Sequence, residues 1–265
     1  MVDLLHPGRI GLAPMEGVID AHARALLTQR SGFDWAVTEF LRVVDTRLPP
    51  RVFYKHCPEL IQAPATTPNG TPVHLQLLGS DPEALAANAH QALTLGATHL
   101  DLNFGCPAKT VNRRDGGASL LRDPRRVEGA VSAVHTALAG AIPVTAKIRL
   151  GFSDRRLALD CAKAAEAGGA YHLVVHARTR DEAIVPRLTG SGLPKYAKFC
   201  TYRSSLMATS GAWKITGVLA AYQAVKMPCS GAVPWRIHFL PIVFVIGNAP
   251  ASVCPGLPGR HAQKS

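Results

Sequence analysis

The chain has 265 residues, a formal net charge of +11 and 47% hydrophobic residues, enough for one large α/β domain or two smaller ones. No apolar run reaches the roughly 18 residues that a membrane span needs, and the N-terminal stretch has no secretory pattern. The six cysteines include no Cys-x-x-Cys pair, which disfavours a disulfide framework or a metal site. We therefore expect a cytoplasmic protein that binds no metal and no membrane.

The charge is distributed unevenly along the chain. All 18 acidic residues lie at or before Glu182, and residues 183–265 carry nine Lys and Arg but no Asp or Glu. A segment of that length ordinarily contains about ten acidic residues. The tail is also apolar and contains Trp, Tyr and Phe, unlike a disordered segment. It resembles neither an ordinary soluble domain nor an ordinary disordered one.

Short apolar runs alternate with helical patterns as far as about residue 180. The expected strands are Ile10–Pro14, Trp35–Phe40, Val73–Leu78, His99–Asn103, Val144–Leu150 and His172–His176. The expected helices are Ala21–Thr28, Pro82–Leu95, Pro124–Ala139 and Arg156–Ala167, two of them preceded by Asp81 and Asp123 as N-caps. This alternation predicts a parallel sheet covered by helices. Six βα units are two fewer than a closed eightfold barrel needs.

Polar residues gather where these strands end, and the loop after His99–Asn103 is the most distinctive. Cys106 lies there between Gly105 and Pro107, placed either for chemistry or as an ordinary buried cysteine. Gln76 and Lys147 are either site residues or edge-facing polar residues, and His176 is either a site residue or a core histidine. The carboxyl ends of barrel strands surround one cavity, so six polar strand ends in succession favour an active site.

The motifs at these strand ends resemble those of the tRNA-dihydrouridine synthases, in particular the bacterial C subfamily. The resemblance covers roughly residues 8–181 and rests on Ala13-Pro-Met-Glu-Gly-Val18, Thr38-Glu-Phe40, His74-Leu-Gln-Leu-Leu-Gly79, Asp101-Leu-Asn-Phe-Gly-Cys-Pro-Ala-Lys-Thr-Val-Asn112, Gly116-Gly-Ala118, Ala146-Lys-Ile-Arg-Leu-Gly151 and His176-Ala-Arg-Thr179. It implies a TIM (β/α)8-type barrel that binds FMN, followed by a small helical domain. It also implies reduction of a tRNA D-loop uridine, expected to be U16, with NADPH as the hydride source.

The resemblance also implies roles for individual residues. Pro14, Met15, Glu16, Gln76, Lys147 and His176 would contact the flavin, and Lys147 would stabilise its reduced anion. Cys106 would protonate one carbon of the uracil ring while hydride reaches the neighbouring carbon. Glu39, Asn103 and Arg149 would bind the flipped-out base.

The resemblance ends near Asp181. The Gly-Tyr-Arg, Asn-Gly-Glu or Asn-Gly-Asp, and Met-Leu-Gly-Arg-Gly motifs with which the family continues are absent from this chain. Ala183–Gly190 can be encoded by bases that, read from the third base, give Tyr-Arg-Pro-Pro-Ala-His-Trp, the family's continuation. Three later segments permit family motifs at the same offset. We hypothesise that residues 1–181 are an FMN-binding partial barrel and that residues 182–265 are a frameshifted tail without a native-like fold.

The frame hypothesis has physical consequences and competes with other interpretations. A sheet of six strands would leave two edges and apolar surface exposed, so we expect aggregation and weak FMN binding. The chain would then be an inactive or non-functional remnant. One alternative is another FMN barrel that acts on free pyrimidines, and a second is a basic tail evolved to bind RNA or membranes. The sequence gives no oligomeric state.

Overall fold

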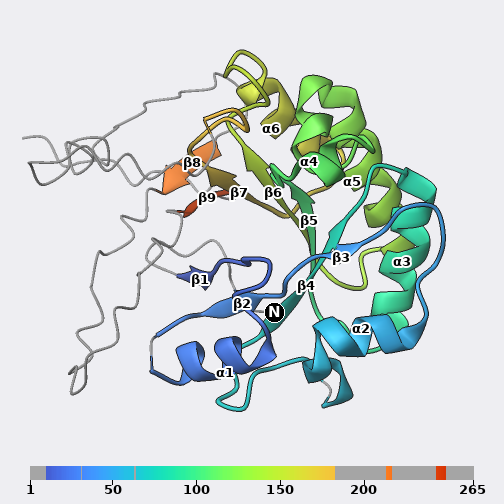
Figure 1. The fold of residues 1–265 in the computed structure, drawn as a ribbon, viewed down its shortest axis with the longest axis vertical. Coiled ribbons are helices and arrows are strands. Elements are labelled where there is room, and N and C mark those ends of the chain that lie inside the picture. The colour runs from blue at the N-terminus through green and yellow to red at the C-terminus, as the bar shows by residue number, and fades with distance from the viewer. Residues whose placement is uncertain (1–9, 31, 63, 183–212, 217–242, 249–265) are drawn as a thin grey trace, which may run out of the picture.

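The structure is a computed structural model that describes residues 10–30, 32–62, 64–182, 213–216 and 243–248. Its centre is a curled parallel sheet whose strands follow one another in chain order (Figure 1). These strands are β1 (Gly11–Leu12), β2 (Trp35–Val37), β4 (Val73–Leu78), β5 (Leu100–Phe104), β6 (Val144–Arg149) and β7 (His172–His176). All six predicted strands are confirmed, and their curvature and order are those of a partial TIM barrel.

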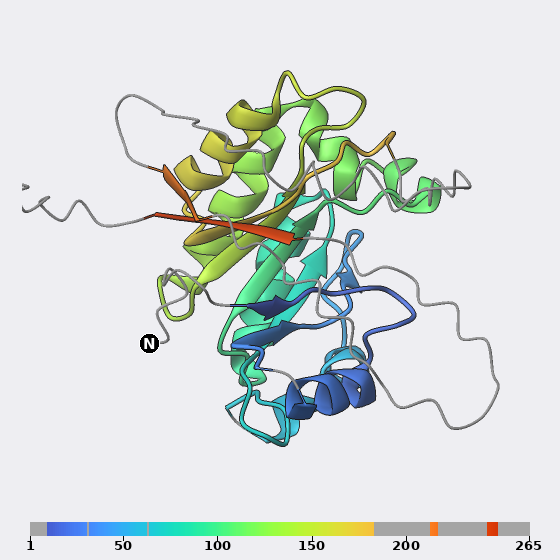
Figure 2. The same cartoon turned by 90° about the vertical axis from the view of Figure 1, so that its left-hand side faces the viewer.

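Helices follow the strands and cover the convex side of this sheet (Figures 1 and 2). They are α1 (Ala21–Arg30), α2 (Pro50–His56), α3 (Pro82–Thr94), the short α4 (Lys109–Asn112), α5 (Pro124–Leu138) and α6 (Ala158–Ala167), with 3₁₀ helices at Pro58–Ile61 and Gly117–Arg122. The Asp81 and Asp123 carboxylates accept hydrogen bonds from the backbone N–H groups of Ala84 and Arg125, as the N-cap prediction required.

The main core lies between the sheet and the helices. Along β4, β5 and β6 every second side chain points outward and is buried, as with Leu75, Leu102 and Ala146. Val131 and Val134 of α5 lie in the same cluster. Because the helices take one face of each strand, the alternate residues are left to line the concave inner face.

Three elements between residues 40 and 73 were not predicted: β3 (Leu41–Arg42), α2 and the 3₁₀ helix Pro58–Ile61. β3 pairs in parallel with the end of β4, and α2 follows it after Pro49. β3 continues the direction of β2 after a break at Thr38-Glu39-Phe40. β2 and β3 therefore pair with the beginning and the end of β4 as one interrupted strand.

The edge at β7 differs from the expectation of an unpaired strand. β9 (Val243–Asn248) pairs with β7 in antiparallel orientation, and β8 (Trp213–Thr216) pairs with β9 (Figure 2). Barrel strands are parallel, so this hairpin-like pair covers the edge without continuing the barrel. The rest of the proposed frameshifted tail lies outside the described residues. Within the described residues, none of the helices is both long and apolar enough to cross a membrane.

Candidate active site

The inner face of β4 to β7 carries polar side chains in register. Gln76 is aligned with Asp101, Asn103 with Lys147, and Arg149 with His176. Aligned residues of neighbouring parallel strands point to the same side of a sheet, so these side chains share one face and form a row that runs obliquely across the four strands. The structure thus brings together the predicted residues Gln76, Asn103, Lys147, Arg149 and His176.

Four side chains and one backbone group in this row form a continuous hydrogen-bonded chain. Thr145 Oγ1 donates to Asp101 Oδ1 at 2.5 Å, and Gln76 Nε2 donates to Asp101 Oδ2 at 2.6 Å. Asn103 Nδ2 then donates to Gln76 Oε1 at 2.9 Å, while the Gly105 N–H donates to Asn103 Oδ1 at 2.9 Å. Gln76 is fully buried, so it is not the edge-facing residue of the alternative interpretation.

Lys147 lies on the inner face next to this chain and is only partly buried. Burial lowers its pKa from 10.5 to about 8, with the Asp101 carboxylate acting in the opposite direction and the Arg149 guanidinium in the same one. Asp101 is buried, and that burial raises its pKa even though Thr145, Gln76 and Lys147 favour the carboxylate. Lys147 therefore retains most of its charge at neutral pH inside the barrel.

Cys106 lies in the loop after β5, with 7% of its surface exposed, against Leu78 and Val111. Its carbonyl accepts hydrogen bonds from the Ala118 N–H at 3.1 Å and from Asn112 Nδ2 at 3.0 Å, which fixes the loop. Burial raises the pKa of the Cys106 thiol, and Glu16 raises it further. Cys106 is thus both buried and at the site, and it holds its proton at neutral pH.

The Cys106 loop also needs a glycine at position 117. Gly117 has φ +58°, and a Cβ there would lie 2.9 Å from the carbonyl oxygen and 3.0 Å from the Cβ of Cys106. A side chain at this position would be strained and would push on the thiol-bearing residue.

Arg149 joins the loop after β5 to the loop after β7, beside His176 at the end of β7. Arg149 Nε donates to the Gly105 carbonyl at 2.7 Å, and its Nη1 donates to the Thr179 carbonyl at 3.1 Å. Burial and, to a smaller extent, the neighbouring cations Arg149, Lys147 and Arg178 together lower the pKa of His176 to about 3. A neutral imidazole therefore lies near three positive charges at the rim.

The predicted residues of the first two strands lie across the concave face from this row. Pro14 lines the same hollow as Asp101 and Lys147, Met15 packs on the small Leu12 cluster, and Glu16 is exposed. Glu39 Oε1 accepts the Val18 backbone N–H at 3.1 Å. Glu39 thereby braces the loop that carries Met15 and Glu16.

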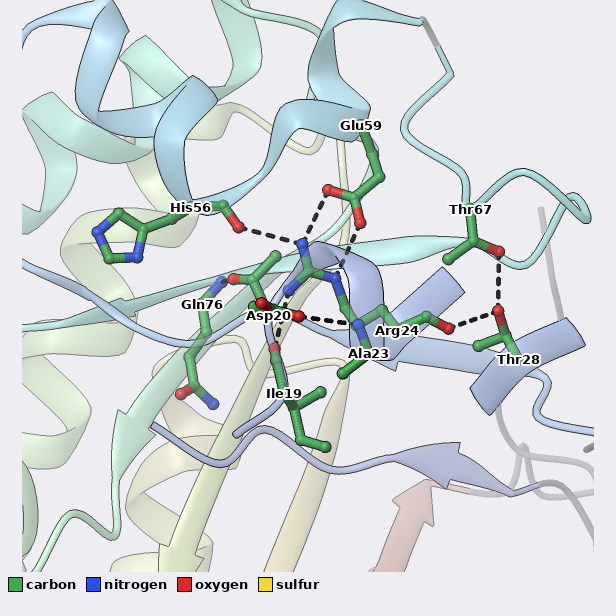
Figure 3. A network of polar contacts seen from close by, with 10 residues as sticks. Ile19, Asp20, Ala23, Arg24, Thr28, His56, Glu59, Thr67 and Gln76 are labelled. Carbon is green, nitrogen blue, oxygen red and sulfur yellow. Dashed lines mark hydrogen bonds and ion pairs between the residues drawn. The ribbon is translucent and has the colours of Figure 1, made fainter. Parts of the chain in front are cut away.

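A buried arginine supports the far end of that loop (Figure 3). Arg24 forms a two-pronged ion pair with Glu59, through Nε–Oε1 and Nη2–Oε2 distances of 2.9 Å. It also donates to the carbonyls of Ile19 at 3.0 Å and His56 at 3.1 Å. Arg24 thus ties the segment after β1 to the segment after α2.

The amino-terminal end of the inner face is closed by aromatic rings. His74 stacks on His99 with ring centroids 4.2 Å apart, and Trp35 contacts both His74 and His172 at 6.0 Å. Burial lowers the pKa of His99 and of His172 to about 4, so both rings are neutral at physiological pH. The described residues contain no group of three or more His, Cys, Asp or Glu placed to hold a metal ion.

Sequence reasoning missed Asp101, Thr145 and Arg24. Asp101 and Thr145 lie inside apolar strands, and their signal is the period of two that they share with Asn103 and Lys147. Arg24 carried no such signal, because its partner Glu59 is 35 residues away in a segment with no predicted element.

Comparison with known proteins identifies the family. The dihydrouridine synthase (Dus) family model matches residues 11–186. The tRNA-dihydrouridine(16) synthases of Aquipseudomonas alcaligenes and Pseudomonas syringae pv. tomato are 52% and 53% identical over 178 residues, which are 67% of this chain and 56% of each relative. That of Pasteurella multocida is 49% identical over 172 residues, 65% of this chain and 55% of the relative. The chain thus spans just over half the length of these curated relatives, and it belongs to the dihydrouridine synthase family.

Proposed function

We propose that residues 11–182 are the flavin- and base-binding half of an enzyme that reduces uridine 16 in the tRNA D-loop to dihydrouridine, with FMN as cofactor and NADPH as reductant. The relatives are named tRNA-dihydrouridine(16) synthases, which supports the substrate and the position of the uridine. The observation that carries the proposal is the position of the buried Cys106 in the loop after β5, at the end of the sheet where the amides and cations of β4 to β7 gather. A cytoplasmic location follows from a tRNA substrate.

The residues of the inner face fit a flavin ring system. Lys147 supplies a partly buried positive charge for an electron-rich ring, and Gln76 and neutral His176 supply groups that can hydrogen-bond its heteroatoms. Pro14 and Met15 offer apolar contacts on the opposite side, with Glu16 at the rim. Reduced FMN, when bound, supplies a hydride. The family motifs of the last two strands, whose loops would hold the FMN phosphate, are absent from this sequence.

The proton in the proposed reaction comes from Cys106. Its thiol keeps the proton at neutral pH, so it can deliver it from Sγ to one carbon of the uracil double bond. We assign Asn103 and Arg149 to the carbonyl edge of the base, because both present N–H donors near the Cys106 loop. Glu39 lies close enough to the Met15–Val18 loop to shape the entrance for the base.

We propose that residues after about 182 are read in a shifted frame and replace the last part of the barrel. The 265-residue chain would then bind FMN weakly and not modify tRNA. The lack of acidic residues after Glu182 supports this proposal. High-accuracy sequencing of codons 178–186 and of the bases that follow tests it. A gene that forbids the alternative frame contradicts the proposal.

The activity is tested on the frame-corrected protein. We expect it to form dihydrouridine in unmodified tRNA, and we expect Cys106→Ala to lose at least about a hundredfold in turnover, since general acid catalysis contributes that much or more. FMN affinity should not change, because the thiol gives up a proton without holding the flavin. Mass spectrometry of digested tRNA measures the product. Turnover of free uracil without tRNA would instead favour the pyrimidine oxidoreductase alternative.

A further inference from the structure

The hydrogen-bonded chain on the inner face has a direction that its two ends determine. The Gly105 backbone N–H can only donate, so Asn103 must turn its oxygen toward it and its Nδ2 toward Gln76. Gln76 must then accept through Oε1 and direct Nε2 toward Asp101. The Gly105 N–H at one end and the Asp101 carboxylate at the other therefore require the same orientation of both amides.

We propose that Asp101 is a positioning residue, which holds the amides of Gln76 and Asn103 in the one orientation that offers their remaining N–H groups to carbonyl oxygens of the bound ring systems. The side-chain nitrogens of Gln76 and Asn103 each carry two hydrogens. The hydrogen-bonded series Thr145–Asp101–Gln76–Asn103–Gly105 uses one hydrogen of each nitrogen and leaves the other for a ligand. Both amides therefore favour a ligand that presents acceptors. Flavin and uracil both carry such carbonyls. The identity of the ligand therefore rests on the proposed function, whereas the direction of the hydrogen bonds does not.

Asp101 suits this role because of where it lies. It is only 2% exposed, lies two residue pairs before the Asn103–Lys147 pair on the same face, and accepts from two donors on neighbouring strands. A buried carboxylate with two short hydrogen bonds has little freedom to move. Losing it would let the Gln76 amide turn, and Asn103 would follow because its own partner had changed.

The first test uses the 265-residue chain without flavin. Selective ¹⁵N labelling of Gln and Asn side chains reports the hydrogen exchange of the Gln76 and Asn103 amides. We expect Asp101→Leu to accelerate exchange of both by at least about tenfold, the loss of roughly one hydrogen bond each. Asp101→Asn should restore most of the protection, because its oxygen still accepts from Gln76 while its nitrogen donates to Thr145, whose hydroxyl can turn to the Leu100 carbonyl 3.3 Å away.

The second test titrates FMN into the same variants of the frame-corrected protein, because the 265-residue chain is expected to bind FMN weakly. Asp101→Leu should weaken FMN binding by about tenfold, and Asp101→Asn should recover most of that loss. Thr145→Val removes the other donor to Asp101 without changing the direction of the chain, so it should change both readouts by less than about threefold. Asn88→Leu is the control for general damage, since Asn88 is equally buried and hydrogen-bonded but lies in α3 on the outer side.

The outcomes separate this inference from the proposed function. If the Asn103 amide keeps its wild-type exchange in Asp101→Leu, or if Asn88→Leu weakens FMN as much as Asp101→Leu does, the positioning role is wrong. If Asp101→Leu does not fold, Gln76→Met cuts the same chain at its middle and must accelerate exchange at Asn103. If the amides respond as expected while the frame-corrected wild-type protein binds no FMN, the direction of the hydrogen-bonded network stands and the flavin assignment fails.

Discussion

Lys147 contributes opposite pH dependences to folding and to binding. Its folded pKa of about 8 lies below its unfolded value of 10.5, because burial disfavours the charged form. Between these two values the unfolded chain binds a proton that the folded chain has released. The free energy of unfolding therefore rises with pH from about 8 to about 10.5. A ligand that needs the positive charge loses affinity over the same range.

We expect Lys147→Met to remove this pH dependence. In wild type, urea unfolding should show a gain in the free energy of unfolding from pH 8 to pH 10 that the variant lacks, while FMN affinity should fall in wild type alone. Lys163, exposed on α6, provides the control substitution Lys163→Met. Identical pH profiles for wild type and Lys147→Met would contradict the assignment of a depressed pKa to this lysine.

Site residues at the ends of strands were predictable from the sequence, whereas two site residues inside strands, Asp101 and Thr145, were not. Cys106, Arg149 and His176 stand at strand ends next to turn residues, and the structure brings all three to one rim. Asp101 and Thr145 are surrounded by leucine, valine and alanine in the sequence, so they read as part of a buried strand. Only the three-dimensional register shows that they face Gln76 and complete its hydrogen bonds.

At the scale of elements, the Arg24–Glu59 pair joins α1 to the 3₁₀ helix Pro58–Ile61 (Figure 3). The side chains are 0% and 8% exposed, so removing one partner leaves a charge buried without its counterion. Such losses cost about 3–5 kcal/mol, whereas replacing both partners by apolar side chains is often neutral. The loop that carries Met15 and Glu16 depends on this pair through the Ile19 carbonyl.

We expect Arg24→Met to destabilise the chain by about 3–5 kcal/mol and the double variant Arg24→Met/Glu59→Met to recover much of that loss. Chemical denaturation of both single variants and the double variant gives the coupling. The exposed pair Arg125–Asp123 is the matched control, and Arg125→Met should leave the unfolding midpoint unchanged. A double variant no more stable than Arg24→Met would show that the pair is not coupled.

The elements that the sequence did not predict are those that are too short to show a period. β3 has two residues and α2 has seven, and both lie in a proline-containing stretch that reads as a loop. The four predicted helices have ten residues or more, and their positions hold to within about two residues at each end. Short elements form here because the rim of the sheet gives them partners, which a local pattern does not encode.

The pairing of β9 with β7 protects an edge of the partial barrel. A partial barrel has open edges that invite pairing with other chains, and β9 covers one of them along the whole of β7. The backbone register runs from His172 opposite Gly247 to His176 opposite Val243. The tail therefore contributes pairing to the sheet even though it adds no βα unit among the described residues.

We expect a chain that ends at Glu182 to self-associate more strongly than the 265-residue chain, since its β7 edge is unpaired. Sedimentation velocity over a range of protein concentrations measures the difference. Val174 lines the inner hollow beside Lys147, so adding Val174→Glu to the shorter chain places an inward-pointing charge on the edge strand and should reduce the association. Equal sedimentation of the two lengths would mean that β9 does not protect this edge.

The position of β9 also determines how the missing part of the barrel could be supplied as a separate fragment. A seventh parallel strand would need the same backbone groups of β7 that β9 already holds. Complementation would therefore proceed by strand exchange, with the departure of β9 as the slow step. Its rate would level off with increasing fragment concentration, and a chain shortened before residue 243 would accept the fragment faster than the 265-residue chain.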